Sequence, residues 1–229
     1  MNYNYADSTA GAVFINGANT IDNSKFSENY VNYDQSKGAA IRVDGVNAEI
    51  LNSEFDNHYA VDGGAIHWVG ANGTIKGSKF NKNTAKSAGG AILWEGVNGT
   101  IEGSEFNENT AKSAGAIDVR NNLVINNTKF NKNSASTFAG ALYIQHDNAV
   151  VNNSEFNKNY ANEAGAIEIH GMNITIDCSN FTENKAMPES EVAHTNYGRG
   201  GAILIRDLEN NQDLTILFEV QYSSIMKLS

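Results

Sequence analysis

Two acidic residues, Asp118 and Glu168, are the side chains in this sequence with the clearest potential for chemistry. Each lies between two aliphatic residues, a pattern that predicts a β-strand with its middle residue on the outer face. They are two periods apart in a repeat of about 25 residues, so stacked repeats would place them about 9–10 Å apart. Inverting glycoside hydrolases hold two carboxyl groups at roughly this separation, one to protonate the leaving oxygen and one to activate water.

The surroundings of these two residues argue against catalysis. No third partner for an active site stands out, so we interpret Asp118 and Glu168 as scattered, solvated charges that form pairs between coils. We predict no catalytic, cofactor-binding or metal-binding residues and no enzymatic activity. The alternative is a β-helical polysaccharide lyase or glycoside hydrolase, or its inactive remnant. The two outward columns, read along the repeats, are Phe14, Arg42, His67, Leu93, Asp118, Tyr143, Glu168 and Leu204, and Asn16, Asp44, Val69, Glu95, Arg120, Gln145, His170 and Arg206.

Other residues with potential for binding have simpler explanations. Trp68 and Trp94 fall at inward positions, so we expect core packing in preference to sugar stacking. Cys178 is the only cysteine, and nothing near it marks an activated thiol. The calcium-binding repeat Gly-Gly-x-Gly-x-Asp is absent, so no metal is expected. The sequence contains six Asn-x-Ser/Thr sequons, which in a secreted protein could carry glycans. Chance explains most of them in a chain with 34 asparagines. They begin at Asn72, Asn98, Asn126, Asn152, Asn173 and Asn180.

A repeat of about 25 residues must position all of these side chains. Its first motif is a block of small residues followed by an aliphatic one, with copies that begin at Ala10, Gly38, Gly63, Gly89, Ala114, Ala139, Ala164 and Gly200. Its second motif is Phe-x-x-Asn, which begins at Phe26, Phe80, Phe106, Phe130, Phe156 and Phe181, while Phe55 is followed by His58 in place of asparagine. This regularity indicates a solenoid in which equivalent residues stack along one axis.

Each repeat contains two segments with strand character. The first follows the small block, and its first and third residues are apolar and therefore point inward. The second lies five residues before the phenylalanine and carries isoleucine or valine. Stacked asparagines could bond to one another along the axis. The residue before the phenylalanine alternates in charge, as in-register parallel stacking requires to avoid repulsion between like charges: Lys25, Glu54, Lys79, Glu105, Lys129 and Glu155.

The spacing between the motifs shows where the coils accept insertions. The small block precedes the phenylalanine by 16 or 17 residues in the seven copies that begin at Ala10 to Ala164. The return to the next block takes 8 or 9 residues, except for 12 after Phe26 and 19 after Phe181. We interpret the longest insertion, 185–199, as a surface loop, although a long loop on a rigid scaffold could also bind a ligand. Its polar and aromatic residues include Pro188, Glu189, Glu191, His194, Tyr197 and Arg199.

These features predict an all-β fold, a single-stranded parallel β-helix of about eight coils of about 25 residues. We assign residues 1–206 to the repeat domain and 207–229 to a partial last coil or an irregular C-terminal cap. Within that last segment, residues 214–216 match the second strand at residues 174–176. Leucine-rich repeats share the period, but they need a leucine framework that this chain lacks.

The paired motifs Gly-Gly-Ala-Ile and Phe-x-x-Asn resemble the repeats of two families. One is the polymorphic outer-membrane proteins of chlamydiae, and the other is the large adhesin-like surface proteins of methanogenic archaea. The resemblance covers residues 1 to about 206 and is more specific for the fold than for a task. It implies a right-handed parallel β-helix displayed on the cell surface, with a glycan or protein of a cell surface as ligand.

Composition narrows the partners further. A net charge of −10 argues against nucleic acid and against an anionic membrane surface, because both attract basic proteins. No apolar run approaches the roughly 18 residues of a membrane span, so direct membrane insertion is not expected. We expect an extracellular or cell-surface protein without cofactors. Because the repeat pattern starts in mid-coil at Met1, we also expect the chain to be part of a larger surface protein.

Overall fold

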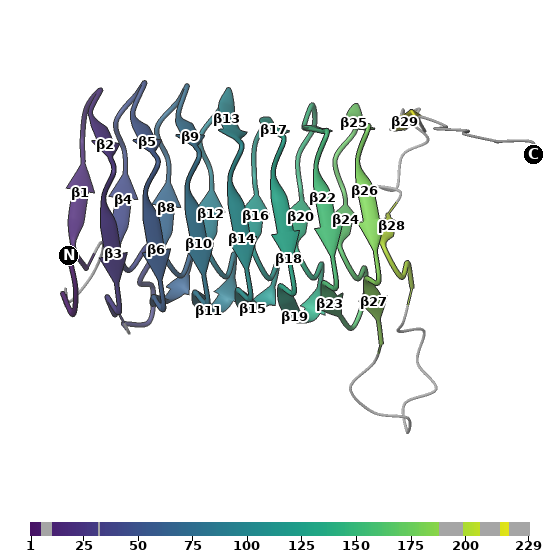
Figure 1. Cartoon of the computed structure of the whole chain (residues 1–229), viewed down its shortest axis with the longest axis horizontal. Coiled ribbons are helices and arrows are strands. Elements are labelled where there is room, and N and C mark those ends of the chain that lie inside the picture. The colour runs from purple at the N-terminus through teal and green to yellow at the C-terminus, as the bar shows by residue number, and fades with distance from the viewer. Residues whose placement is uncertain (6–10, 32, 188–198, 207–215, 220–229) are drawn as a thin grey trace, which may run out of the picture.

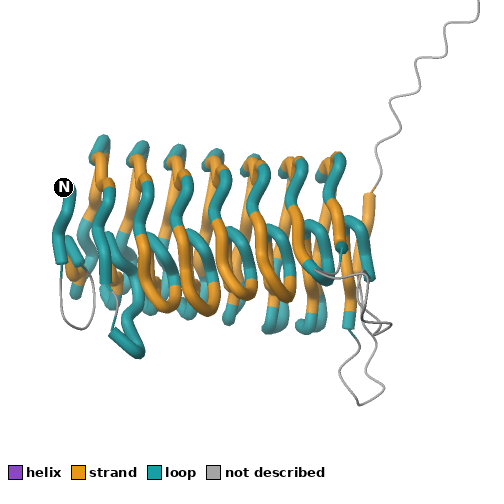
Figure 2. The backbone as a smooth tube through the Cα atoms, turned by 90° about the horizontal axis from the view of Figure 1, so that it is seen from below, coloured by secondary structure: helices purple, strands orange, loops and turns teal. Residues whose placement is uncertain are grey.

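Short β-strands stack into a rod in a computed structural model of the protein (Figure 1). The structure describes residues 1–5, 11–31, 33–187, 199–206 and 216–219. Within these ranges the chain forms strands, turns and loops without a helix. Successive coils follow one another along the long axis in sequence order (Figure 2).

Four parallel sheets run the length of the rod. Sheet 1 follows the small blocks and contains β1 (Val13–Ile15), β4 (Ile41–Val43), β8 (Ile66–Trp68), β12 (Ile92–Trp94), β16 (Ile117–Val119), β20 (Leu142–Ile144), β24 (Ile167–Ile169) and β28 (Ile203–Ile205). Sheet 2 contains β2 (Thr20–Asp22), β5 (Glu49–Leu51), β9 (Thr74–Lys76), β13 (Gly99–Glu102), β17 (Leu123–Asn126), β21 (Val150–Asn152), β25 (Ile174–Asp177) and β29 (Ile216–Glu219).

The other two sheets contain the phenylalanines and the residues that follow them. Sheet 3 contains β3 (Lys25–Ser27), β6 (Glu54–Asp56), β10 (Lys79–Asn81), β14 (Glu105–Asn107), β18 (Lys129–Asn131), β22 (Glu155–Asn157) and β26 (Asn180–Thr182). Sheet 4 contains β7 (Tyr59–Asp62), β11 (Thr84–Ala88), β15 (Thr110–Ser113), β19 (Ser134–Phe138), β23 (Tyr160–Ala161) and β27 (Lys185–Ala186). Each complete coil therefore has four short strands, two more than the sequence predicted.

The register confirms that equivalent residues stack on one another. Ile92 pairs with Ile66 on one side and with Ile117 on the other, in parallel. Phe80 likewise pairs with Phe55 and Phe106. The eight small blocks give eight strands in sheet 1, and the coil completes about seven turns. The predicted parallel β-helix is therefore confirmed.

The core consists of columns of identical or similar apolar side chains. The stacked phenylalanine rings of sheet 3, from Phe26 to Phe181, have centroids 4.7–5.1 Å apart. Trp68 and Trp94 are fully buried and stack at 4.7 Å, and each indole nitrogen donates a hydrogen bond to a backbone carbonyl of its own coil. The expectation that the tryptophans pack in the core is confirmed. Burial of each large side chain stabilises the fold by roughly 1.5–3 kcal/mol.

A ladder of buried asparagines lines the corner between sheets 3 and 4. The backbone nitrogen and Nδ2 of Asn83 both donate to Oδ1 of Asn109, at 3.0 Å each. The second hydrogen of Asn83 Nδ2 bonds to the carbonyl of Phe55, 3.0 Å away in the preceding coil. Asn133 and Asn159 continue the same pattern. Each amide thus bonds to two backbone groups of the preceding coil and to the side-chain amide of the next coil, which explains why asparagine recurs at this position.

His58 interrupts this ladder. Its Nδ1 accepts a hydrogen bond from the backbone nitrogen of Asn29 at 3.0 Å, and its own backbone nitrogen donates to Oδ1 of Asn83. Its Nε2 is buried and has no hydrogen-bond partner within the described part of the chain. Burial is the largest influence on the imidazole and lowers its pKa to about 4, because a charged ring would lose its hydration.

The small block is explained by the close approach of neighbouring coils. A Cβ atom on Gly90 would lie 2.0 Å from the carbonyl oxygen of Gly115, and one on Gly115 would lie 2.1 Å from that of Gly140. These contacts are with backbone, which cannot move aside as a flexible side chain can. Glycine at this position therefore allows the coils to stack at their normal spacing.

The two ends of the described chain continue the same columns. Near the N-terminus, the backbone nitrogen and Nδ2 of Asn4 donate to Oδ1 of Asn29, so Asn4 belongs to the asparagine ladder. Near the other end, β29 extends sheet 2 by pairing with β25. The sequence match placed Leu214 opposite Ile174, whereas the structure places Ile216 there. That prediction was therefore wrong by two residues, a shift that preserves the alternation of a strand.

Candidate functional site

The outer face of sheet 1 brings the two candidate carboxylates into one column. Asp118 pairs in register with Tyr143, and Tyr143 pairs with Glu168. The two acids are therefore two coils apart, as predicted, with the tyrosine between them. Their side chains are, however, completely buried, so the interpretation that they are solvated surface charges was wrong. The reason is that longer side chains two residues further along the chain fold back over them.

Asp118 is held by two neighbours that occupy both of its oxygens. The guanidinium of Arg120 binds Oδ2 through Nε and Nη2, each at 3.0 Å, and Gln145 Nε2 donates to Oδ1 at 2.5 Å. Burial raises the pKa of Asp118, while the adjacent Arg120 and the Gln145 hydrogen bond act in the opposite direction. Both oxygens of the carboxylate are thus occupied within the protein.

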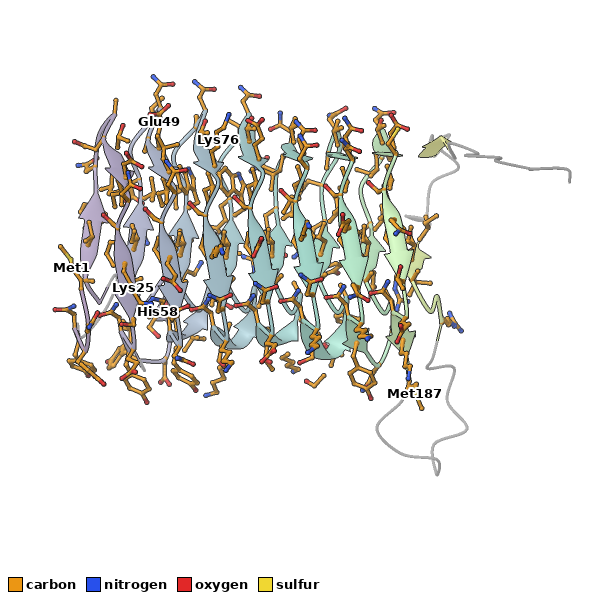
Figure 3. The ribbon with its side chains drawn as sticks, in the orientation of Figure 1. Met1, Lys25, Glu49, His58, Lys76 and Met187 are labelled. Atoms are coloured by element: carbon orange, nitrogen blue, oxygen red, sulfur yellow. The ribbon has the colours of Figure 1, made fainter. Side chains whose placement is uncertain are left out.

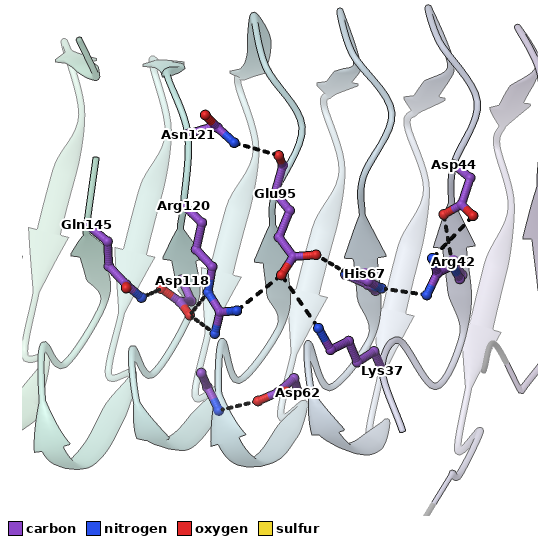
Figure 4. A network of polar contacts seen from close by, with 11 residues as sticks. Lys37, Arg42, Asp44, Asp62, His67, Glu95, Asp118, Arg120, Asn121 and Gln145 are labelled. Carbon is purple, nitrogen blue, oxygen red and sulfur yellow. Dashed lines mark hydrogen bonds and ion pairs between the residues drawn. The ribbon is translucent and has the colours of Figure 1, made fainter. Parts of the chain in front are cut away.

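The contacts continue from Arg120 toward the N-terminal end of the rod, as Figure 4 shows. Arg120 Nη1 lies 3.1 Å from Glu95, which also accepts from His67 Nε2 at 2.6 Å. Lys37 approaches the same carboxylate at 3.5 Å. Burial would raise the pKa of Glu95, but the hydrogen bond from His67 together with the two cations Lys37 and Arg120 lowers it overall. This group of side chains therefore links several coils through charged contacts.

The partners of His67 fix its tautomer. Arg42 Nη1 lies 3.3 Å from His67 Nδ1, and a guanidinium can only donate, so Nδ1 must be the acceptor. The ring proton then sits on Nε2 and is donated to Glu95. Burial lowers the pKa of His67 despite the nearby carboxylate, which agrees with a neutral ring. Arg42 is itself anchored by Asp44 at 2.8 Å.

A second group of polar side chains surrounds Glu168. Its Oε1 accepts from His170 Nε2 at 2.9 Å and from Arg206 Nε at 2.8 Å. Arg206 also forms an ion pair with Glu163 and lies over the ring of Phe138. Burial raises the pKa of Glu168, and the hydrogen bond from His170 opposes that shift. Its other oxygen, Oε2, is buried and has no hydrogen-bond partner among the described residues.

Tyr143 joins the two groups. Its hydroxyl lies 3.5 Å from His170 Nε2, and its ring meets the imidazole edge-to-face with centroids 5.0 Å apart. Burial and the charges of Glu168 and Asp118 raise the pKa of Tyr143 to about 12, so the phenol remains protonated at neutral pH. The face thus offers one carboxylate with both oxygens occupied, one with a free oxygen, and a protonated phenol between them.

Sequence reasoning missed that these acids have partners. It found no third group near Asp118 and Glu168, whereas the structure supplies Arg120, His170 and Arg206. The spacing in the sequence could have indicated these partners. Each of them lies two residues after an outward-facing residue, so both side chains lie on the same face of the strand. The outward column that contains Asp118 and Glu168 and the one that contains Arg120, His170 and Arg206 form a single surface, and they had been considered separately.

The remaining candidates are distributed elsewhere. Cys178 lies half-buried in the turn after β25 with a positive φ of 46°. Four of the sequon asparagines are exposed, namely Asn72, Asn98, Asn173 and Asn180, while Asn126 and Asn152 are half-buried. Residues 188–198 of the long insertion lie outside the described residues. Among the described residues, no group of three or more histidine, cysteine or acidic side chains is placed to hold a metal ion.

The fold and this polar face define the class of the protein, a single-stranded parallel β-helix with ladders inside and ion pairs outside. Residues 10–181 match the family model described as right handed beta helix region, and the chain belongs to this family. No match to the chain was found among curated proteins or among solved structures. In the ranges that the structure describes, no helix has the length and apolar character needed to cross a membrane.

Proposed function

We propose that the protein is a non-enzymatic, adhesin-like module of the cell surface, which serves as a stalk or binding scaffold. The observation that carries this proposal is the occupation of Asp118 by Arg120 and Gln145. A carboxylate that acts as an acid or base must reach a substrate proton directly or through water. The contacts of Asp118, Arg120 and Glu95 instead link neighbouring coils of the protein to one another. The resemblance of the repeats to those of surface proteins supports the location.

The lateral surface suits a rigid support. Lys25, Glu54 and Lys79 follow one another in register on sheet 3, so opposite charges face each other along the rod. Figure 3 shows polar side chains projecting along the whole length of the coils. A solenoid with such a surface presents ligand contacts at fixed spacing and tolerates insertions at one turn.

The runner-up is a carbohydrate-active enzyme, and one specific observation favours it. Glu168 has a raised pKa and a free, buried Oε2, and it lies beside His170 and Tyr143 and two coils from Asp118. A raised pKa favours the protonated form of a carboxyl group, which is the form that a general acid requires. The two proposals differ in one point. The enzyme requires the carboxylate of Asp118 to release Arg120 and contact a substrate, whereas the scaffold does not.

Two measurements on the full chain test the proposal. The first is antibody labelling of intact source cells before and after protease treatment, which we expect to reveal the protein on the surface. The second is incubation with a panel of plant, microbial and host polysaccharides, with release of reducing ends or unsaturated products as the readout, for which we expect no turnover.

Matched variants separate the two candidates. Turnover by the wild-type chain that disappears in both Asp118→Asn and Glu168→Gln would establish the enzyme. Turnover that persists in both variants would point to a contaminating activity, and absence of surface labelling would contradict the proposed location.

A further inference from the structure

The outer face of sheet 4 carries a column in which tyrosines border three small hydroxyl residues. Tyr5 pairs with Tyr30 and Tyr30 with Tyr59 through parallel bridges. The column then continues in register from Tyr59 through Thr84, Thr110 and Ser134 to Tyr160. With strands about 4.8 Å apart, the four steps from Tyr59 to Tyr160 span about 19 Å along the rod.

Each bordering tyrosine is half-buried and has a small hydroxyl residue as its register neighbour on one side. Tyr59 stacks on Tyr30 with ring centroids 5.1 Å apart, but its other neighbour in the column is Thr84, whose side chain is too short to cover a ring. Tyr160 likewise has Ser134 as its neighbour toward the hydroxyl residues. Aromatic surface of this kind, with a polar hydroxyl at its tip, suits a ligand that is apolar on one face and polar at its edges.

Three exposed lysines lie near the hydroxyl residues. Lys82, Lys86 and Lys112 are exposed, and none of them forms an ion pair with any described residue. Lys86 and Lys112 each lie two residues beyond the paired threonines of adjacent strands. Elsewhere, along sheet 3, lysine alternates with glutamate. This local excess of positive charge lies on a chain with a net charge of −10.

The surface next to this face is hollowed at both ends. A depression of about 380 Å³ is lined by Asp56, Asn57, Asn81, Lys82, Asn107 and Glu108, and another of about 220 Å³ by Lys158, Asn159, Tyr160, Glu183 and Lys185. The three acidic residues in these linings each pair with a lysine: Asp56 with Lys25, Glu108 with Lys132 and Glu183 with Lys158. The hydroxyls between the tyrosines can both donate and accept, as the 3.1 Å contact between Thr110 Oγ1 and Ser134 Oγ illustrates.

We infer that this face, bounded by Tyr59 and Tyr160, binds an acidic oligosaccharide. Sugar hydroxyls bond to Thr84, Thr110 and Ser134, the sugar carboxylate or sulfate groups pair with the lysines, and the tyrosines pack against the terminal sugar rings. Charge complementarity selects an anionic glycan over a neutral one. The inference rests on the proposed binding function and assigns it a site and a class of ligand.

Calorimetric titration of the full chain tests the inference. The probes are a hexasaccharide of galacturonic acid, a heparin-derived hexasaccharide and a neutral cello-oligosaccharide of equal length. We expect one or both acidic probes to bind, with affinity that falls as salt increases. The double variant Lys86→Gln/Lys112→Gln should weaken binding by about tenfold, and Tyr160→Ser should also weaken it. The double variant Lys86→Arg/Lys112→Arg should retain it.

The matched control is Lys129→Gln, which removes an exposed lysine that is paired with Glu155 on sheet 3 and should leave binding unchanged. Circular dichroism and thermal melting confirm that each variant is folded. Equal affinity for the neutral probe, failure of both acidic probes, or acidic binding that survives the lysine and tyrosine changes would each overturn the inference. Surface labelling and binding to other glycans on an array would in those cases still support the proposed function, so the two failures are distinguishable.

Discussion

Two sets of buried polar side chains are built on the same coils, and they satisfy their hydrogen bonds in different ways. At the corner between sheets 3 and 4, Asn83, Asn109 and Asn133 bond to one another in one pattern, which repeats from coil to coil except at His58. On the outer face of sheet 1, Asp118 and Glu168 bind different partners, and no two coils use the same arrangement. One set is periodic and the other is not.

The two sets of side chains differ in what they contribute to the solenoid. A periodic ladder adds the same interface energy at each coil, so it stabilises the stack wherever it occurs. An aperiodic group stabilises only its own coils, and each of its buried charges must find a partner because an unpaired buried charge is costly. The ladder therefore specifies the fold, whereas the outer face is free to differ between members of the family.

The largest effect is expected from breaking the ladder at its centre with Asn109→Leu. This change leaves the backbone nitrogen and Nδ2 of Asn83 without an acceptor and the carbonyl of Phe80 without a donor. Unsatisfied buried groups cost roughly 1–3 kcal/mol each, so we expect a loss of about 4 kcal/mol in the free energy of unfolding. Urea denaturation followed by circular dichroism measures it.

The control for this change is Asn107→Ala, two residues away on the outer face of sheet 3, where the side chain donates to Asn81 and is partly exposed. We expect a loss below about 1 kcal/mol there, since water replaces the hydrogen bond. Equal losses for the two variants would show that burial of the ladder has no special importance.

Repairing the ladder at His58 should change the pH dependence of stability. The pKa of His58 is lowered from 6.5 to about 4 in the folded state, so between these values the unfolded state binds more protons. Stability therefore decreases as the pH falls from 6.5 toward 4, by roughly 3 kcal/mol in total. In His58→Asn we expect the acid-side loss of stability to shrink by this amount and the amide to complete the ladder, with a higher melting temperature at all pH values.

Melting temperatures between pH 4 and pH 7 provide the measurement, and His146→Asn is the control. His146 is exposed and belongs to no ladder contact, so its replacement should leave the profile as in the wild type. A His58→Asn protein with an unchanged acid-side slope would show that other groups cause the loss of stability.

On the outer face of sheet 1, Arg120→Met should destabilise the protein by about 2 kcal/mol, because Asp118 stays buried with only Gln145 as partner. Burial already raises the pKa of Asp118, so the loss should shrink in acid, where the carboxyl group becomes neutral. Adding Asp118→Asn should recover part of the stability at pH 7. Additive losses in this double-mutant cycle would mean that the two side chains do not interact.

The sequence predicted the periodic part of the molecule and failed on the aperiodic part. Repetition of Ile66, Ile92 and Ile117 at one spacing predicts their stacking, because the same side chain needs the same environment in each coil. The burial of Asp118 and Glu168 has no such signal, since it depends on how Arg120, Gln145 and Arg206 fold back over them. Sheets 3 and 4 were also missed, because left-handed residues such as Lys82, with a φ of 53°, cut them into very short strands.

The smallest effect on stability is expected at the exposed surface. There, a lysine can be replaced by glutamate either in the column of alternating charges on sheet 3 or on sheet 4, where neighbouring lysines lack acidic partners among the residues that the structure describes. In Lys129→Glu the new carboxylate lies between Glu105 and Glu155, which should cost about 0.5–1 kcal/mol in the free energy of unfolding. In Lys86→Glu the new carboxylate lies on the strand next to that of Lys112, so we expect no loss or a slight gain.

Both variants change the net charge by the same amount, so general repulsion within this acidic chain cancels when they are compared. The remaining difference between the free energies of unfolding of the two variants comes from the charges of the neighbouring residues in each column. It should disappear in about 1 M salt, where charges more than roughly 3 Å apart are screened. Urea midpoints at low and high salt measure it. Identical midpoints for the two variants at low salt would mean that stacked neighbours do not sense each other's charge, and the alternation of lysine and glutamate would then need another explanation.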